Sequence, residues 1–243
     1  MNQSPFILCA MLLAGGSAHA LVGASEPAPR EAAASAVMVL KQGGGGAGFC
    51  TGVAISRTAV LTAGHCAQGA RNLAVNVGAF GKPQLVAVSS ASVHPEYVPD
   101  AARKRVRSID LAILRLAEPL PASVTIARLD TGGAVRPGQR FTIAGFGLTR
   151  EGDERSAGQL RMGTLEAREP ISRILLWAHD PGRKGFGACT GDSGGPIFAT
   201  DGRLAAITVW STGEGKKTCG ALTQGALVAP QRSWIDRVIA GAP

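Results

Sequence analysis

The chain has 243 residues, 45% of them hydrophobic and 17% charged, and 25 Lys and Arg against 17 Asp and Glu give a formal net charge of +8. This length accommodates one large all-β domain or two small ones. The basic residues are spread along the chain and form no tail, which favours a solvated basic surface over a nucleic-acid-binding one. We therefore expect no nucleic-acid partner.

Residues 1–20 are typical of a secretory signal peptide. An apolar run from Phe6 to Ala14 precedes the small-x-small sequence Ala18-His19-Ala20, which suits cleavage by a signal peptidase. The apolar run is too short to remain as a membrane anchor. We expect a secreted or periplasmic mature chain, residues 21–243, with no membrane anchor.

Short apolar runs alternate with turn residues along the rest of the chain, in a sequence with 33 glycines. This pattern predicts many short strands and an all-β barrel or sandwich. The predicted strands are Ala36–Leu40, Val53–Ile55, Val60–Thr62, Leu73–Val77, Gln84–Val88, Leu111–Leu116, Arg140–Ala144, Pro196–Phe198 and Leu204–Val209. Only Ser233–Ile239 predicts a helix, because its apolar residues recur on one side. Residues 131–138 are the expected connection between two halves.

Four cysteines remain after removal of the signal peptide: Cys50, Cys66, Cys189 and Cys219. An even number of cysteines in an exported chain indicates two disulfides. A zinc site is the alternative, but the sequence has no C-x-x-C pair of the kind that such sites use. We therefore expect no metal.

The most specific segment is Gly191-Asp192-Ser193-Gly194-Gly195-Pro196. A serine hydroxyl becomes a useful nucleophile only when a base removes its proton and hydrogen-bond donors receive the developing oxyanion. The glycines beside Ser193 allow a tight turn, in which the amides of Gly191 and Ser193 can point at one oxygen. The alternative is an ordinary glycine-rich turn.

Three histidines outside the signal peptide are candidates for the base: His65, His94 and His179. His65 adjoins Cys66, so a disulfide there would fix its backbone. His94 and His179 lie in turn-like sequences and are expected to be surface loop residues. His65 is therefore the predicted base.

Asp110 is the predicted partner of that histidine. It stands at the entrance to the apolar strand Leu111–Leu116, where a carboxylate needs a partner. An acid in this position holds the imidazole in the right tautomer and stabilises its charged form. The other aspartates considered, Asp100, Asp130 and Asp180, have the setting of turn residues.

The order of these residues along the chain separates the classes of serine hydrolase. No histidine follows Ser193, which excludes the Ser–acid–His order of α/β-hydrolases. No aspartate precedes His65, which excludes the subtilisin order. The order His65, Asp110, Ser193 remains.

With these motifs the chain resembles the chymotrypsin/trypsin family of serine proteases over nearly its whole mature length. The matching segments are Leu21–Ala24, Phe49–Gly52, Leu61–Cys66, Val93–Tyr97, Ser108–Leu116, Ile143–Gly147 and Cys189–Pro196, together with Trp210 and Trp234. The resemblance implies an all-β fold of two antiparallel six-stranded β-barrels with a C-terminal α-helix. Barrel one is expected at about 21–130 and barrel two at about 131–243.

The resemblance also implies roles for particular residues. His65, Asp110 and Ser193 would form the catalytic triad, with the amides of Gly191 and Ser193 as the oxyanion hole. The implied disulfides are Cys50–Cys66 and Cys189–Cys219. The implied specificity pocket is uncharged, unlike that of trypsin, and is formed by Gly187, Ala188, Trp210, Ser211 and Gly225. The amino group of Leu21, freed on signal-peptide removal, would pair with Asp192.

The expected function is that of a monomeric, secreted serine endopeptidase that needs no metal or cofactor. It would act on polypeptide substrates, and a protein inhibitor is a further expected kind of partner. Two alternatives remain: a binding protein on a protease fold, and a secreted esterase on the same fold. Val209 favours the first, because it replaces a serine that usually supports the catalytic aspartate in this family.

Overall fold

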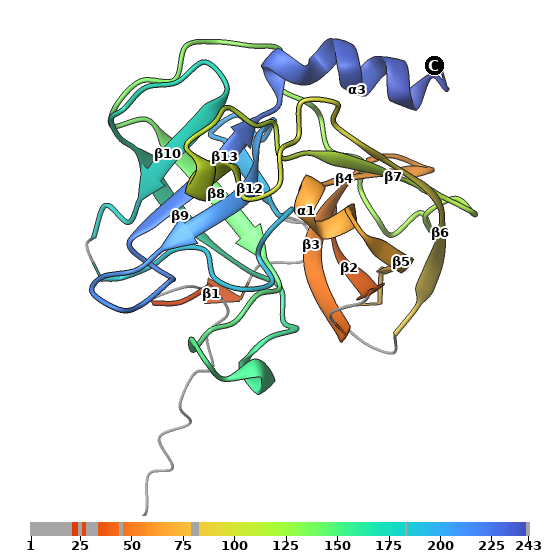
Figure 1. Cartoon of the computed structure of the whole chain (residues 1–243), viewed down its shortest axis with the longest axis horizontal. Coiled ribbons are helices and arrows are strands. Elements are labelled where there is room, and N and C mark those ends of the chain that lie inside the picture. The colour runs from red at the N-terminus through yellow and green to blue at the C-terminus, as the bar shows by residue number, and fades with distance from the viewer. Residues whose placement is uncertain are drawn as a thin grey trace, which may run out of the picture.

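The computed structural model describes residues 21–23, 26–27, 34–43, 46–78, 83–182 and 184–241. The predicted signal peptide, residues 1–20, lies outside the described residues. Two β-barrels stand side by side, and the C-terminal helix lies along one end of the pair (Figure 1).

The first barrel is closed by six antiparallel strands in the order β2-β3-β4-β7-β6-β5. These strands are β2 (Ala36–Gly43), β3 (Gly46–Ser56), β4 (Ala59–Thr62), β5 (Ala70–Asn76), β6 (Leu85–Val93) and β7 (Ala112–Leu116). Alternate residues of β2 point inward, so that Val37 and Val39 are buried in the core. The side chains of β4 are buried throughout, because this strand lies between the barrel interior and neighbouring segments.

The second barrel has the strand order β9-β10-β13-β12-β11-β8, and a further pairing of β8 with β9 closes it. Its strands are β8 (Arg140–Gly145), β9 (Arg161–Ala167), β10 (Leu175–His179), β11 (Pro196–Ala199), β12 (Leu204–Thr212) and β13 (Leu222–Leu227). The predicted pair of six-stranded antiparallel barrels is therefore confirmed. The strands β9, β10 and β13 were absent from the sequence-based prediction.

The N-terminal segment lies against the second barrel, not against the first barrel to which the predicted boundary assigned it. Leu21 is fully buried in the core of the second barrel, and Val22 forms a β-bridge with Gly187. The short strand β1 (Glu26–Pro27) pairs with β9. The described chain therefore lies first against the second barrel, then forms the first barrel, and then forms the strands of the second.

Helical structure is limited to short segments. These are α1 (Gly64–Ala67), α2 (Ala101–Lys104), η1 (Glu154–Ser156), η2 (Ala229–Gln231) and α3 (Arg232–Ile239). The predicted C-terminal helix is confirmed as α3, which buries Trp234 and Ile235 in a hydrophobic cluster that contains residues of both barrels. Within the described part of the chain, no helix has the length and apolarity needed to cross a membrane.

His94 is buried and is not the surface loop residue that its sequence predicted. Only 5% of it is exposed, and its ring meets that of Trp234 edge to face at a centroid distance of 4.6 Å. Its Nδ1 accepts a hydrogen bond from the amide of Glu96. Burial lowers the pKa of His94, which keeps this ring neutral as part of the packing between α3 and the first barrel.

Two glycines of β3 provide a test of how tightly the first barrel is packed. A Cβ on Gly52 would lie 2.7 Å from Val60 Cγ1 and 2.8 Å from Val39 Cγ2, whereas one on Gly48 would lie 3.6 Å from Lys41 Cε. We expect Gly52→Ala to lower the free energy of unfolding by about 1–3 kcal/mol, because a packed core resists added volume.

Gly48→Ala is the matched control, and it should leave stability unchanged or raise it by about 0.4–1 kcal/mol. Urea denaturation of the two variants measures the difference. Equal stability of Gly52→Ala and the native protein would show that the barrel core has room for a methyl group.

Candidate active site

Two neighbouring strands of the first barrel bring His65 and Asp110 together. Thr62, at the end of β4, is the antiparallel partner of Ala112, at the start of β7. His65 follows Thr62 on the short helix α1, and Asp110 precedes Ala112. His65, which follows β4, and Asp110, which precedes β7, therefore meet at the same end of the barrel.

The Asp110 carboxylate holds both the backbone and the ring of His65. Its Oδ1 accepts a hydrogen bond from the backbone amide of His65 at 2.9 Å, and its Oδ2 lies 2.7 Å from His65 Nδ1. A carboxylate at Nδ1 favours the tautomer with the proton on that nitrogen. The other ring nitrogen, Nε2, is then free to accept a proton, as a general base must.

The surroundings of Asp110 are largely closed to water on one side. A Cβ on Gly64 would lie 2.9 Å from Asp110 Oδ1 and 3.2 Å from a ring carbon of Tyr97, so these groups pack tightly around the start of α1. Burial, with the negative charges of Asp110 and Asp100, raises the pKa of Tyr97 to about 12. Val209, on β12 of the second barrel, is buried in a hydrophobic cluster that joins the two barrels, and its side chain has no donor to offer the carboxylate.

Ser193 comes from the second barrel, in the turn that precedes β11. Its carbonyl accepts a hydrogen bond from the amide of Thr51 at 2.8 Å and lies 3.8 Å from Cys66 Sγ. These contacts place Ser193 beside the residue that follows His65. In the described part of the chain the Ser193 hydroxyl makes no hydrogen bond to His65, and such contacts often tighten only when substrate binds.

The backbone amides of Gly191 and Ser193 donate no hydrogen bond to any residue that the structure describes. The peptide that carries the Gly191 amide is oriented by its carbonyl, Thr190 O, which accepts from Leu148 N at 2.8 Å. Gly191 has φ of +95°, and a Cβ there would lie 2.4 Å from the ring of Phe49. Only glycine fits this position.

Asp192, which lies between Gly191 and Ser193 in the sequence, is fully buried. Its Oδ1 accepts a hydrogen bond from Gly147 N at 2.8 Å and its Oδ2 from Cys189 N at 2.9 Å. A Cβ on Gly145 or Gly147 would lie within 2.5 Å of this carboxylate, so both glycines make room for it. Burial raises the pKa of Asp192 to about 7, although the two amides act in the opposite direction.

Both predicted disulfides are present. Cys50–Cys66 links β3 to α1, and Cys189–Cys219 links the turn before Ser193 to the segment before β13. Ligand atoms of Cys50, His65 and Cys66 lie within 4.8 Å of one another. Because both sulfurs belong to the disulfide, this group is not a metal site of thiolates.

The predicted pocket residues fall into two groups. Gly187 and Ala188 are buried side by side, whereas Trp210 is 42% exposed and Ser211 is half-buried, with its hydroxyl donating to Thr218 O. The first two therefore stand deep in the second barrel and the other two near its surface.

Gly225, which the sequence assigns to the specificity pocket, packs against core residues of the second barrel and is not among the nearest neighbours of Gly187. A Cβ on Gly225 would lie 2.8 Å from Ile197 Cδ1 and 2.9 Å from Ala206 Cβ, within the barrel core. Thr223, two residues earlier on β13, stands beside Gly187 instead: a Cβ on Gly187 would lie 3.2 Å from Thr223 Oγ1. The Thr223 hydroxyl also accepts a hydrogen bond from Ala188 N. No local sequence pattern marks Thr223, because its position beside Gly187 depends on the packing of two segments far apart in the chain.

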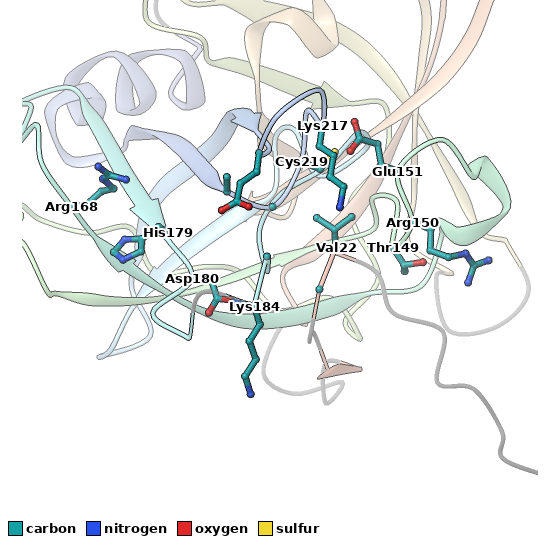
Figure 2. Close-up of a pocket in the computed structure, with 15 residues that line it drawn as sticks. Val22, Thr149, Arg150, Glu151, Arg168, His179, Asp180, Lys184, Lys217 and Cys219 are labelled. Atoms are coloured by element: carbon teal, nitrogen blue, oxygen red, sulfur yellow. The ribbon is translucent and has the colours of Figure 1, made fainter.

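A cavity of about 1030 Å³ lies on the second barrel, lined by none of His65, Asp110 and Ser193. Side chains of both charge signs surround it, and that of Lys217 reaches toward Val22 (Figure 2). Several of these charges are already engaged within the chain: Glu151 accepts from Thr218, and Arg150 pairs with Asp153. The cavity therefore favours no single ligand chemistry.

Comparison with known proteins agrees with this architecture. A family model described as Trypsin matches residues 21–235. "Trypsin" from Saccharopolyspora erythraea is 30% identical over 183 residues, which are 68% of this chain and 76% of that protein. "Granzyme M" from Homo sapiens is 32% identical over 214 residues, covering 79% of this chain and 80% of that protein.

Among solved structures, "Human heparin binding protein" is similar with a TM-score of 0.75 and 25% identity, covering 91% of this chain and 98% of that one. "Neuropsin, a serine protease expressed in the limbic system of mouse brain" has a TM-score of 0.71 and 22% identity, covering 89% of this chain and 99% of that one. The second likeness concerns the fold alone.

Proposed function

The chain belongs to the trypsin family, and we propose that it is a secreted serine endopeptidase with His65, Asp110 and Ser193 as its catalytic triad. The observation that carries the proposal is the hydrogen bond of 2.7 Å between His65 Nδ1 and Asp110 Oδ2. It prepares Nε2 of His65 as a base next to the turn that holds Ser193.

In the proposed reaction, His65 Nε2 takes the proton of the Ser193 hydroxyl as its oxygen attacks the carbonyl carbon of a peptide bond. The amides of Gly191 and Ser193, which donate to no described residue, would stabilise the negative oxygen that forms. The charged His65 then gives its proton to the leaving amine, and Asp110 stabilises that charge. Water hydrolyses the resulting acyl-enzyme by the same steps in reverse.

Export of the chain is part of the proposal. Both disulfides are typical of proteins that fold in an oxidising compartment. The sequence of residues 1–20 supplies the expected signal peptide.

The first prediction from this mechanism concerns Ser193. Ser193→Ala should reduce kcat by about 10⁶-fold, the effect of removing the nucleophile of a triad. A fluorophosphonate should label the native protein at Ser193, as peptide mapping by mass spectrometry can establish. Labelling that persists in Ser193→Ala would refute the assignment.

The same experiment separates the alternatives. A binding protein on this fold, favoured by the likeness to heparin binding protein and by the net charge of +8, would show neither labelling nor turnover. An esterase would be labelled and would hydrolyse simple esters while leaving peptide amides intact. The proposed endopeptidase hydrolyses both.

We propose that the P1 side chain, that of the residue whose carbonyl is attacked, is small and uncharged and lies beside Gly187 and Ala188. No charged side chain stands at Gly187 or Ala188, so a buried Lys or Arg would lack a counter-ion there. Thr223 narrows the space beside Gly187, where a Cβ would already lie 3.2 Å from its hydroxyl oxygen. We therefore propose that Gly187, Ala188 and Thr223 form the floor of the pocket, with Trp210 and Ser211 nearer its mouth.

We expect kcat/KM to be highest for peptides with Ala or Val at P1 and lowest for Arg and Lys. Thr223→Gly should raise the ratio of kcat/KM for Phe over Ala by about 10-fold or more, because it removes the side chain that narrows the pocket. A set of peptides that differ only at P1 measures this ratio.

Thr223→Ser is the control, because it keeps the hydroxyl that accepts from Ala188 N and removes only a methyl group. It should shift the ratio less than Thr223→Gly does. A strong preference of the native enzyme for Arg or Lys would contradict this view of the pocket.

Signal-peptide removal is the proposed activating step. Val22 packs in the cluster that contains Cys189, and the amide of Cys189 donates to Asp192 Oδ2. The predicted mature start is therefore close to the buried carboxylate. A free ammonium on Leu21 would pair with Asp192 and hold the turn that contains Gly191 and Ser193.

A protein that begins at a free Leu21 should have kcat/KM about 10²-fold higher than one that begins Met-Leu21, the scale of losing one oxyanion-hole donor. The pairing would raise the pKa of the α-amine above its free value of about 8. Its contribution to stability is then complete below pH 8 and is lost as the pH rises through the raised value. Activity measured against pH should fall there.

A protein in which Asp192 has no ammonium partner should depend on pH in a different range and through the carboxylate itself. The pKa of Asp192 is raised to about 7 by burial, so with the upstream chain attached the protein should lose stability as the pH rises from about 4 to about 7. The difference in Tm between this form and its Asp192→Asn variant isolates that loss. Equal activity of the free-Leu21 and Met-Leu21 proteins, or a native N-terminus well beyond Leu21, would disprove the activation mechanism.

A further inference from the structure

Thr51 is a fully buried residue of β3 whose polar atoms all bond to other segments. Its amide donates to Ser193 O at 2.8 Å, and its hydroxyl donates to Gly191 O at 2.8 Å. The same hydroxyl accepts from Phe146 N at 3.1 Å, and its carbonyl accepts from the Thr62 hydroxyl at 2.8 Å. Three of these four bonds join the first barrel to the second.

The direction of the hydroxyl proton is fixed by its neighbours. The amide of Phe146 can only donate, and the carbonyl of Gly191 can only accept. The Thr51 hydroxyl must therefore receive one hydrogen bond and give the other. Phe146 is fully buried and Gly191 is buried, so water does not replace either partner at low cost.

The hydrogen bond from Thr51 to Gly191 O fixes the orientation of the peptide that follows Gly191. The peptide before Gly191 is fixed through Thr190 O, which accepts from Leu148 N. The peptide after it is fixed through Gly191 O, which accepts from Thr51. Gly191 has no side chain to restrict its rotation at φ of +95°, so these hydrogen bonds set the direction of its amide.

We propose that Thr51 is a positioning residue for the reaction: its hydroxyl holds the Gly191 carbonyl so that the Gly191 amide faces the oxygen that becomes negative in the transition state. This inference rests on the proposed endopeptidase function. Thr51 touches no reacting atom and acts only through Gly191.

Thr51→Val tests the proposal, because it preserves the shape of the side chain and removes both hydroxyl bonds. We expect kcat to fall by about 10-fold or more, part of the loss caused by deleting an oxyanion-hole donor outright. KM should stay within about 2-fold, since the ground-state carbonyl depends less on this amide. Thr51→Ser keeps the hydroxyl and should retain most of the native kcat.

A peptide boronic acid provides a readout that a loss of folded protein does not move. Its boron forms a tetrahedral adduct with the Ser193 oxygen, and one boron-bound oxygen occupies the position of the oxyanion. The inhibition constant of Thr51→Val should rise by the same factor as kcat/KM falls. Titration with a fluorophosphonate corrects every rate for the fraction of active protein.

Thr62→Val is the matched control: it removes a buried hydroxyl bond to Thr51 O and touches no part of Gly191. It should lower Tm and leave the boronic acid inhibition constant within about 2-fold of the native value, because the Gly191 amide keeps its direction. Thr51→Ala gives a second test of the missing hydroxyl if Thr51→Val does not fold.

The outcomes separate this inference from the proposed function. A native protein that hydrolyses peptides, with kcat and inhibition constant unchanged in Thr51→Val and Thr51→Ala, would overturn the role of Thr51 alone. A native protein that neither hydrolyses peptides nor reacts with fluorophosphonate would overturn both proposals.

Discussion

The buried carboxylate of Asp192 is the constraint on which the rest of the candidate site depends. Withdrawing a carboxylate from water is costly, and hydrogen bonds from the amides of Gly147 and Cys189 offset only part of that cost, because burial still raises the pKa of Asp192 to about 7. These two bonds fix the residues on either side, Gly191 and Ser193, against the second barrel. The absence of side chains at Gly145 and Gly147 is what makes this burial sterically feasible.

The candidate site is divided between the barrels, so its geometry depends on their contact. His65 and Asp110 are set by the pairing of β4 with β7 in the first barrel, whereas Ser193 belongs to a turn of the second. Thr51 crosses this boundary with three hydrogen bonds. Strand register sets the positions of the candidate catalytic residues within each barrel. A few buried hydrogen bonds, such as those of Thr51, set the position of one barrel's residues relative to the other's.

Much of the fold and of the site could be predicted from the sequence, but three strands of the second barrel could not. Strand β9 contains Gly163 and charged residues, and β13 contains Gly225, so neither has the local composition of a strand. All three strands, β9, β10 and β13, pair with a neighbouring strand on both sides, and this pairing is not visible in local sequence. His94 was misjudged for a related reason, since its turn-like sequence gives no sign that Trp234 covers it.

The sequence by itself determined an all-β fold, two disulfides and the three candidate catalytic residues, and its contiguous motifs carried the resemblance to the family that implied the two barrels and the disulfide pairings. Only the tertiary structure decided that Leu21 lies in the second barrel, that Thr223 rather than Gly225 stands beside Gly187, and that Thr51 holds Gly191. Each of these depends on contacts between residues far apart in sequence. Strand register, loop length and barrel closure set such contacts, and no local pattern specifies them.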